Sequence, residues 1–204
     1  MRNTRLTRTA LVLLLITATA VSAQEMTQAE KERALQYLES TKTNLLEATK
    51  GLSDAQWSFK SAPDRWSVAQ VMEHIAVSED FIRDNLVKEK VMVSGQGQPD
   101  RDVKTIDEAV VTMIPDRIHK VQAQEPVLPR NRFGSPEESL KHFLASRATT
   151  ERYLQTTAGL RDHVMDGPVG KMDGYEFILF IAAHCERHTK QIEEVKADPN
   201  FPRN

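Results

Sequence analysis

The segment YEFILFIAAHCERHTKQIEEVKA, residues 175–197, repeats apolar side chains at the three- and four-residue spacing of an α-helix. Its stripe consists of Phe177, Ile181, His184, His188, Ile192 and Val195. Such a stripe faces a protein core, so the segment predicts a core helix that ends before Pro199. At about 100° per residue, both histidines lie inside the stripe and are expected to be buried.

The first two predicted helices each begin with a capping box. TQAE at 27–30 opens a helix over about 27–51, and SVAQ at 67–70 opens a second helix that ends before Gly95. A short helical turn is expected between them, at 53–59. Leucine and valine residues recur at helical spacing after both capping boxes, so each helix should turn one face toward the core.

Two more helices are predicted before the last one. Residues 106–121 keep helical spacing, but Pro115 should kink this helix or divide it in two. SPEE at 135–138 supplies an N-cap, a proline at the first helical position and acids in the first turn of a helix that passes through Leu154. Residues 159–174 are expected to form a loop, and no strand pattern competes. The chain is therefore predicted to be one all-α helical bundle.

Residues 1–23 have the pattern of a secretory signal peptide. Three arginines precede the apolar run 10–16, and VSA at 21–23 fits the small-residue cleavage pattern. The run is shorter than the roughly 20 residues that a membrane-spanning helix needs, so no stable membrane anchor is expected. We predict that residues 24–204 form one domain that is exported to the periplasm or secreted.

Charge and cysteine content narrow the function classes. Removing residues 1–23 takes away three arginines and no acidic residue, which changes the formal net charge from −2 to −5. No segment clusters lysine and arginine with aromatic residues, so a nucleic-acid partner is not expected. Cys185 is the single cysteine and cannot form an internal disulfide. The stability of the chain must therefore come from its core.

Three histidines form the candidate metal site. His184 and His188 are four residues apart and share one helix face, so both imidazoles can approach one ion. His74, seven residues after the N-cap at Ser67, is the candidate third ligand. A lone core histidine is usually hydrogen-bonded rather than metal-bound, but two buried histidines one turn apart favour a metal. Three imidazoles plus water form an open site for zinc first, or nickel as the alternative.

Two neighbouring residues could change this interpretation. In the metalloprotease motif HExxH the glutamate follows the first histidine directly, whereas here Glu186 comes two residues after His184, about 200° around the helix. It should point away from the ion, which disfavours a metalloprotease. Cys185 lies on the core stripe and could act as a soft ligand, although a small core residue is the favoured interpretation.

Other polar residues leave alternatives open. Arg147 and Glu151 fall within the apolar stripe of the helix that begins at 135. Either they form an inward ion pair that orients the histidines, or they lie at the rim. The remaining histidines, His119, His142 and His163, are interpreted as solvated.

The pattern WSxxQxxxHI that contains His74 and the pattern HxxxHxxQI from His184 to Ile192 resemble the DinB-like superfamily over about 170 residues. The resemblance implies a four-helix bundle with up-down-down-up topology and a divalent-metal site, matched here by His74, His184 and His188. Members of that superfamily include thiol-S-transferases and a mycothiol-dependent isomerase. We therefore expect an exported metal-dependent hydrolase or transferase of an unknown small-molecule substrate. A non-catalytic metal-stabilised binding module is the alternative, and a homodimer remains open.

Overall fold

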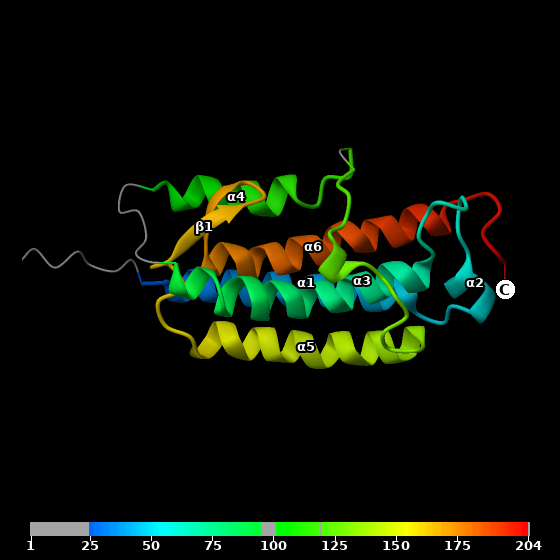
Figure 1. Ribbon diagram of the computed structural model, residues 1–204, viewed down its shortest axis with the longest axis horizontal. Helices are drawn as coiled ribbons and strands as arrows, with labels where there is room; N and C mark the ends of the chain where they lie inside the picture. The colour runs from blue at the N-terminus through cyan, green and yellow to red at the C-terminus, as the bar shows by residue number, and fades with distance from the viewer. Residues whose placement is uncertain (1–24, 95–100, 119, 204) are drawn as a thin grey trace, which may run out of the picture.

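The computed structural model describes residues 25–94, 101–118 and 120–203. The expected signal peptide at 1–23 and His119 lie outside the described residues. Four long helices form the expected up-down-down-up bundle (Figure 1). They are α1 (Gln28–Thr49), α3 (Val68–Asp80), α5 (Pro136–Thr156) and α6 (Gly174–Lys196). In Figure 1, α1 and α6 run from left to right, and α3 and α5 run the opposite way.

Because α3 and α5 are parallel, the chain between them must return along the whole bundle. It continues from α3 into a π-helical segment, η1 (Phe81–Lys88), and then a short turn, η2 (Val91–Val93). Helix α4 (Val103–Met113) carries the chain back along α6, and one 3-10 turn, η3 (Glu125–Val127), lies above the middle of the bundle (Figure 1). This connection covers the face on which α3 meets α6.

Side-chain caps explain where the helices begin. Thr27, Ser53, Ser67 and Asp173 each accept the backbone N–H three residues later, and the residue at that position returns a bond to the cap N–H. The turn expected at 53–59 is the short helix α2 (Asp54–Ser58). The capping boxes at Thr27 and Ser67 therefore lie where the sequence predicts them.

The core is divided into two apolar clusters with a polar layer between them. The cluster near the start of α6 includes Leu38, Leu154 and Phe177, and the other includes Leu45, Phe143 and Ile192. The residues between the clusters are polar on every long helix; they are Thr41, Ser78, Glu79, Arg147, Thr150 and His184. The candidate metal site therefore lies at a break in the apolar core.

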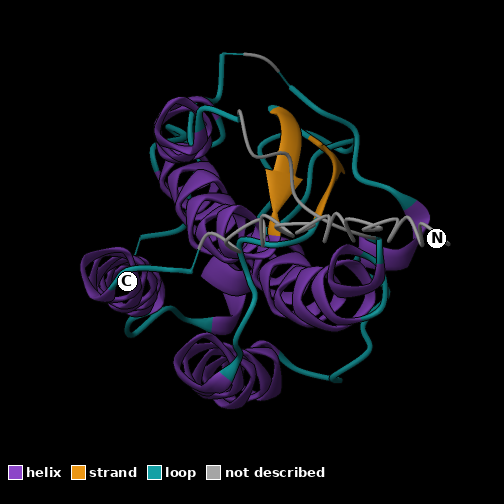
Figure 2. Ribbon diagram, turned by 90° about the vertical axis from the view of Figure 1, so that its left-hand side faces the viewer, coloured by secondary structure: helices purple, strands orange, loops and turns teal. Residues whose placement is uncertain are grey.

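The prediction of a plain loop at 159–174 is wrong. Strands β1 (Val164–Gly167) and β2 (Gly170–Asp173) pair as an antiparallel hairpin, which lies beside the helices in Figure 2. A φ of +114° lets Gly170 close the tight turn. Met172 is fully buried, and a Cβ at Gly167 would lie 2.5 Å from its sulfur. Strands of four residues are too short to show a clear alternation in sequence.

The helix predicted for 106–121 ends early. Helix α4 stops at Met113, and neither 114–118 nor 120–124 is helical. Pro115 has no backbone N–H to donate to the carbonyl of Val111, so the helical hydrogen bonding cannot continue. The guanidinium of Arg187 on α6 donates to the carbonyl oxygens of Ile114 and Asp116. Pro115 therefore ends this helix rather than kinking it.

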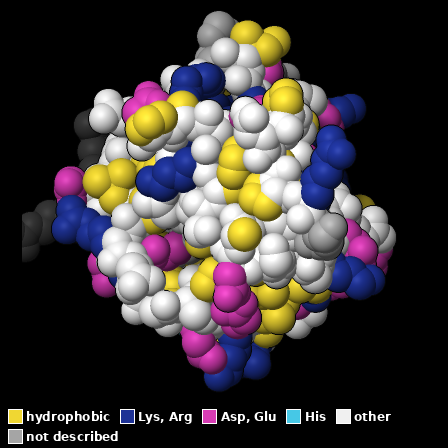
Figure 3. Space-filling model, turned by 90° about the vertical axis from the view of Figure 1, so that its right-hand side faces the viewer, with side chains coloured by type: hydrophobic (Ala, Val, Ile, Leu, Met, Phe, Trp, Pro, Cys, Tyr) yellow, Lys and Arg dark blue, Asp and Glu magenta, His cyan; other side chains and the backbone are white. Residues whose placement is uncertain are grey.

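The surface carries charges of both signs. Figure 3 shows lysine, arginine and acidic side chains interspersed on the end of the molecule where α2 lies. Among the described residues, no helix combines the length and apolarity that crossing a bilayer requires.

Candidate metal centre

The packing of α3 against α6 brings the three predicted histidines together. His74 comes from the second turn of α3, and His184 and His188 come from successive turns of α6. One ring nitrogen of each lies within 4.8 Å of those of the other two. The ring centroids are 5.0 Å apart for His74 and His184, and 4.4 Å apart for each of the other two pairs. Residues 110 positions apart in sequence thus form one cluster.

Two hydrogen bonds fix how the rings present their nitrogens. Nδ1 of His74 lies 2.7 Å from the carbonyl oxygen of Val127, and Nδ1 of His188 lies 2.8 Å from Oε1 of Gln191. Arg117 also donates to Oε1 of Gln191, at 3.3 Å, which fixes the orientation of this amide because arginine only donates. Both oxygens are acceptors, so each Nδ1 carries the proton and each Nε2 keeps a lone pair.

These two lone pairs face each other. Nε2 of His74 and Nε2 of His188 are 3.2 Å apart. Two acceptors at this distance repel unless a proton or a cation lies between them. In tetrahedral zinc sites, Zn–N bonds of about 2.0–2.1 Å place two nitrogen ligands about 3.3 Å apart. The observed spacing therefore fits two ligands of one tetrahedral ion.

Burial keeps the three imidazoles neutral, which is the form that binds metal. Burial lowers the pKa of His74. It lowers the pKa values of His184 and His188 well below the usual range, and the neighbouring histidines lower them further. Three uncharged nitrogen donors in one place form the donor set of an open zinc or nickel site.

The site is walled by aromatic rings and still reaches solvent. The Trp66 ring lies 4.8 Å from that of His74, and the Phe180 ring lies 5.7 Å from that of His184. His74 is buried, whereas His184 and His188 are partly exposed.

The two residues that could have changed the interpretation face elsewhere. Glu186 accepts a hydrogen bond from the hydroxyl of Tyr37 at 2.7 Å and pairs with Lys190 at 2.7 Å, so its carboxylate is engaged away from the histidines. Cys185 is buried, and its sulfur lies 3.7 Å from the carbonyl oxygen of Thr41 on α1. The thiol is therefore a core group rather than a ligand of the triad.

Arg147 points inward, but the prediction that it pairs with Glu151 is wrong. Its Nε and Nη2 each lie 2.8 Å from an oxygen of Glu79, and its Nη1 lies 3.0 Å from Oγ1 of Thr41. Glu151 is half-buried and lies 3.9 Å from Nζ of Lys42. None of these partners of Arg147 is a histidine, so the ion pair belongs to the polar layer rather than to the orientation of the triad.

His142 and His163 are less solvated than predicted. The His142 ring stacks on Phe133 with centroids 4.4 Å apart, and its Nε2 lies 2.5 Å from Oδ2 of Asp80. His163 is partly buried in the approach to β1. Neither belongs to the histidine cluster.

Sequence reasoning missed the groups that hold the histidines. The carbonyl of Val127 carries no side-chain signature, and Gln191 was recognised only as part of the HxxxHxxQI pattern. Glu73, which precedes His74, is buried and accepts three backbone N–H groups from residues 130–132. A charged residue at a buried helix position was the one signal that could have identified it.

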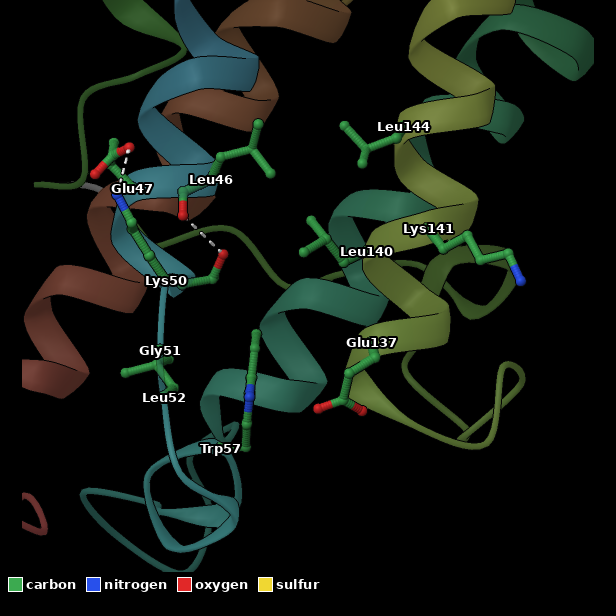
Figure 4. A pocket seen from close by; sticks show the side chains of 11 residues that line it. Leu46, Glu47, Lys50, Gly51, Leu52, Trp57, Glu137, Leu140, Lys141 and Leu144 are labelled. Carbon is green, nitrogen blue, oxygen red and sulfur yellow. Dashed lines mark hydrogen bonds and ion pairs between the residues drawn. The ribbon is translucent and has the colours of Figure 1, made fainter. Parts of the chain in front are cut away.

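One surface groove lies away from the histidines. A groove of about 640 Å³ runs between the end of α1, α2 and the start of α5 (Figure 4). Its lining includes Trp57 and Leu140 and none of the histidines. Its two lysines are paired locally, with Lys50 3.6 Å from Glu47 and Lys141 3.3 Å from Glu138. This groove offers apolar contact area but no ligand set for a metal.

Comparisons with known proteins agree with this fold. The family model described as the DinB superfamily matches residues 37–192, a range that includes all three histidines. The uncharacterized protein YuaE of Bacillus subtilis (strain 168) is 27% identical over 152 residues, which cover 72% of this chain and 87% of YuaE. The solved structure of YfiT from Bacillus subtilis superposes with a TM-score of 0.55 at 15% identity, covering 88% of this chain and 93% of YfiT. YfiT is described as a probable metal-dependent hydrolase with an unusual four-helix bundle topology.

Proposed function

The chain belongs to the DinB superfamily, and from that premise we propose that it is a metal-dependent hydrolase in which His74, His184 and His188 hold one divalent ion. Zinc is the first choice and nickel the second. The observation that carries the proposal is the pair of Nε2 atoms 3.2 Å apart, each on a ring whose Nδ1 is already hydrogen-bonded. Such a pair is satisfied by a shared cation.

The similarity to YfiT supports hydrolysis as the reaction class, because that protein is described as a probable metal-dependent hydrolase. A metal-dependent transferase that uses the same three histidines is the alternative reaction class. When bound, the ion would lower the pKa of a coordinated water towards about 7 or polarise a substrate carbonyl or phosphoryl oxygen. Trp66 and Phe180 would limit the approach of bulk water beside the rings. Val127 and Gln191 would keep the rings in their orientation.

One observation favours a non-catalytic binding module as the second candidate. The triad lies at the break between two apolar clusters, where an ion would also join α3 to α6. The partial exposure of His184 and His188 supports the enzyme instead, since a structural site is usually closed by a fourth protein ligand.

Elemental analysis and calorimetric titration test the proposal. We expect the protein to bind about one zinc or nickel ion per chain. Each of the variants His74→Ala, His184→Ala and His188→Ala should weaken this binding strongly. His142→Ala is the matched control, because that ring lies outside the cluster. A wild-type protein that takes up no divalent ion, or a His188→Ala variant that binds as tightly as wild type, would refute the site. Turnover of ester and phosphoester panels by the loaded protein, lost with the ion, separates the enzyme from the binding module.

We also propose that the protein is exported, on the basis of the arginines, the apolar run and the VSA pattern within residues 1–23. The mature chain should then begin at Gln24. N-terminal sequencing of protein from the exported fraction tests this, and a cytoplasmic protein that keeps Met1 would contradict it.

A further inference from the structure

Glu73 is a buried carboxylate, 5% exposed, and it precedes the candidate ligand His74 on α3. It accepts three consecutive backbone N–H groups of the α4–α5 connection. Its Oε1 lies 2.9 Å from the nitrogens of Arg130 and Arg132, and its Oε2 lies 2.8 Å from that of Asn131. Carboxylate bonds to backbone N–H groups are charge-assisted and therefore stronger than neutral ones.

The backbone is specially shaped to make this contact. Asn131 is the one non-glycine residue among those described with a positive φ, at 59°. This left-handed conformation turns successive N–H groups toward one point, which creates a binding site for an anion. In this protein the anion is the Glu73 side chain itself. The segment therefore closes on α3 and is not simply a loop that passes over it.

The same segment supplies the partner of His74. Three residues before Arg130, the carbonyl of Val127 accepts from Nδ1 of His74 at 2.7 Å. Arg132 also donates to the carbonyl oxygen of Pro126 at 3.0 Å, which ties the two parts of the segment together. Two adjacent residues of α3 thus contact segment 125–132. Glu73 accepts hydrogen bonds from the backbone of this segment, and His74 donates one to it.

We propose that Glu73 is a positioning residue of the metal site. Its carboxylate anchors residues 130–132, and this anchor holds the Val127 carbonyl against Nδ1 of His74, so that Nε2 stays free for the ion. The inference rests on the proposed function, because only a bound metal ion gives the free Nε2 of His74 something to coordinate. Its local part, the control of the His74 tautomer, is independent of any metal.

The variant Glu73→Gln tests the idea because it keeps the size of the side chain. A glutamine has one acceptor oxygen, and its NH₂ group would face a backbone N–H, so at least one of the three N–H groups loses its partner. Glu73→Asp keeps the charge on a shorter side chain, so it should disturb the His74 tautomer and the zinc affinity less than Glu73→Gln does. The matched control is Glu186→Gln, a half-buried carboxylate on α6 that is bonded to Tyr37 and does not touch the connection.

Two measurements are needed. Nitrogen-15 NMR of the metal-free protein should show His74 protonated on Nδ1 in wild type and in Glu186→Gln, and a mixture of tautomers in Glu73→Gln. Zinc titration against a chelator should show Kd raised about ten- to a hundredfold in Glu73→Gln, the range expected when the hydrogen-bond partner of a ligand is disturbed.

The outcomes separate the two proposals. A folded Glu73→Gln variant with the wild-type His74 tautomer and a zinc Kd within twofold of wild type overturns the positioning role. A wild-type protein that binds neither zinc nor nickel, combined with a tautomer change in Glu73→Gln, refutes the proposed function but supports the role of Glu73. If Glu73→Gln does not fold, Glu73→Asp decides by the same two measurements.

Discussion

Arg147 on α5 and Glu79 on α3 form a bidentate ion pair inside the bundle, with both N–O distances at 2.8 Å and both side chains out of contact with water. The guanidinium also lies 4.9 Å over the Phe143 ring and donates to Thr41 on α1. The pair therefore joins α1, α3 and α5 at the level where the apolar core is interrupted. Its role is in the stability of the bundle, and the histidines take their orientation from other groups.

We expect Arg147→Met to destabilise the protein by about 3–5 kcal/mol, because it leaves the Glu79 carboxylate buried without a partner. Combining it with Glu79→Leu should restore much of that loss, since buried ion pairs can often be replaced by apolar residues. Urea unfolding of both variants measures this, with the exposed Arg152→Met as the control. Zinc affinity should stay within about twofold in a folded Arg147→Met protein. A large loss of affinity there would mean that the pair does orient the histidines.

Gln191 gives a second prediction. Its side-chain oxygen holds Nδ1 of His188 at 2.8 Å and is itself held by Arg117. Gln191→Leu removes the acceptor, so the His188 ring can rotate or place its proton on Nε2. The expected result is a zinc affinity weakened about 10- to 100-fold with little change in fold. Calorimetric titration compares this variant with Gln155→Leu, which changes an exposed glutamine on α5. Equal affinities for the two variants would show that Gln191 does not support the site.

The helices and the shared face of two candidate ligands were predictable because their signals are local. Capping boxes and apolar spacing repeat within one or two turns, and His184 and His188 share a face by helical geometry alone. These features depend on neighbours in the sequence, which a single sequence displays directly. The capping box at Ser67 placed His74 on its own helix only, and the resemblance to the DinB-like superfamily implied its pairing with His184 and His188.

The supporting contacts were not predictable because they join distant segments. Val127 contributes a backbone carbonyl, which every residue type has. Arg147 was recognised as a charge on an apolar stripe, but its partner Glu79 lies on another helix, so periodicity within α5 pointed to Glu151 instead. The hairpin after α5 is held by the packing of Met172 rather than by strand propensity.

A buried charge cluster beside the hairpin should make stability depend on pH. Arg161 donates to both oxygens of Asp107, at 3.0 and 2.8 Å, and to Asp173 at 3.0 Å, while Arg101 donates to Glu176 at 2.6 Å. Burial raises the pKa of the Glu176 carboxyl from 4.5 to about 7, against the lowering effect of the Arg101 hydrogen bond. The cluster therefore holds a carboxyl group that prefers its protonated form in the folded state.

The sign of the effect follows from proton binding. Between pH 4.5 and about 7 the folded protein binds more protons at Glu176 than the unfolded chain does. The stabilisation that comes from the protonated Glu176 carboxyl is therefore fully present below pH 4.5 and is lost as the pH rises through about 7. Glu176→Gln removes the titration. The stability of wild type relative to this variant should therefore decrease as the pH rises from 5 to 8, as measured by urea unfolding at several pH values. The variant Glu89→Gln, at an exposed position, is the control. A constant difference for Glu176→Gln would contradict the raised pKa.

Metal binding should also appear as thermal stability, because the three ligands join α3 to α6 only in the folded protein. Free ion at 100 times its Kd stabilises a folded protein by about 2.7 kcal/mol when the unfolded chain does not bind it. For a domain of this size each kcal/mol raises Tm by about 2–4 °C, so saturating zinc should raise Tm by roughly 5–10 °C. His142→Ala should keep this shift and His188→Ala should lose it, as measured by calorimetry with and without chelator. An equal shift in His188→Ala would place the bound ion outside the triad, and the absence of a shift in wild type would mean that the facing Nε2 atoms of His74 and His188 share no zinc ion.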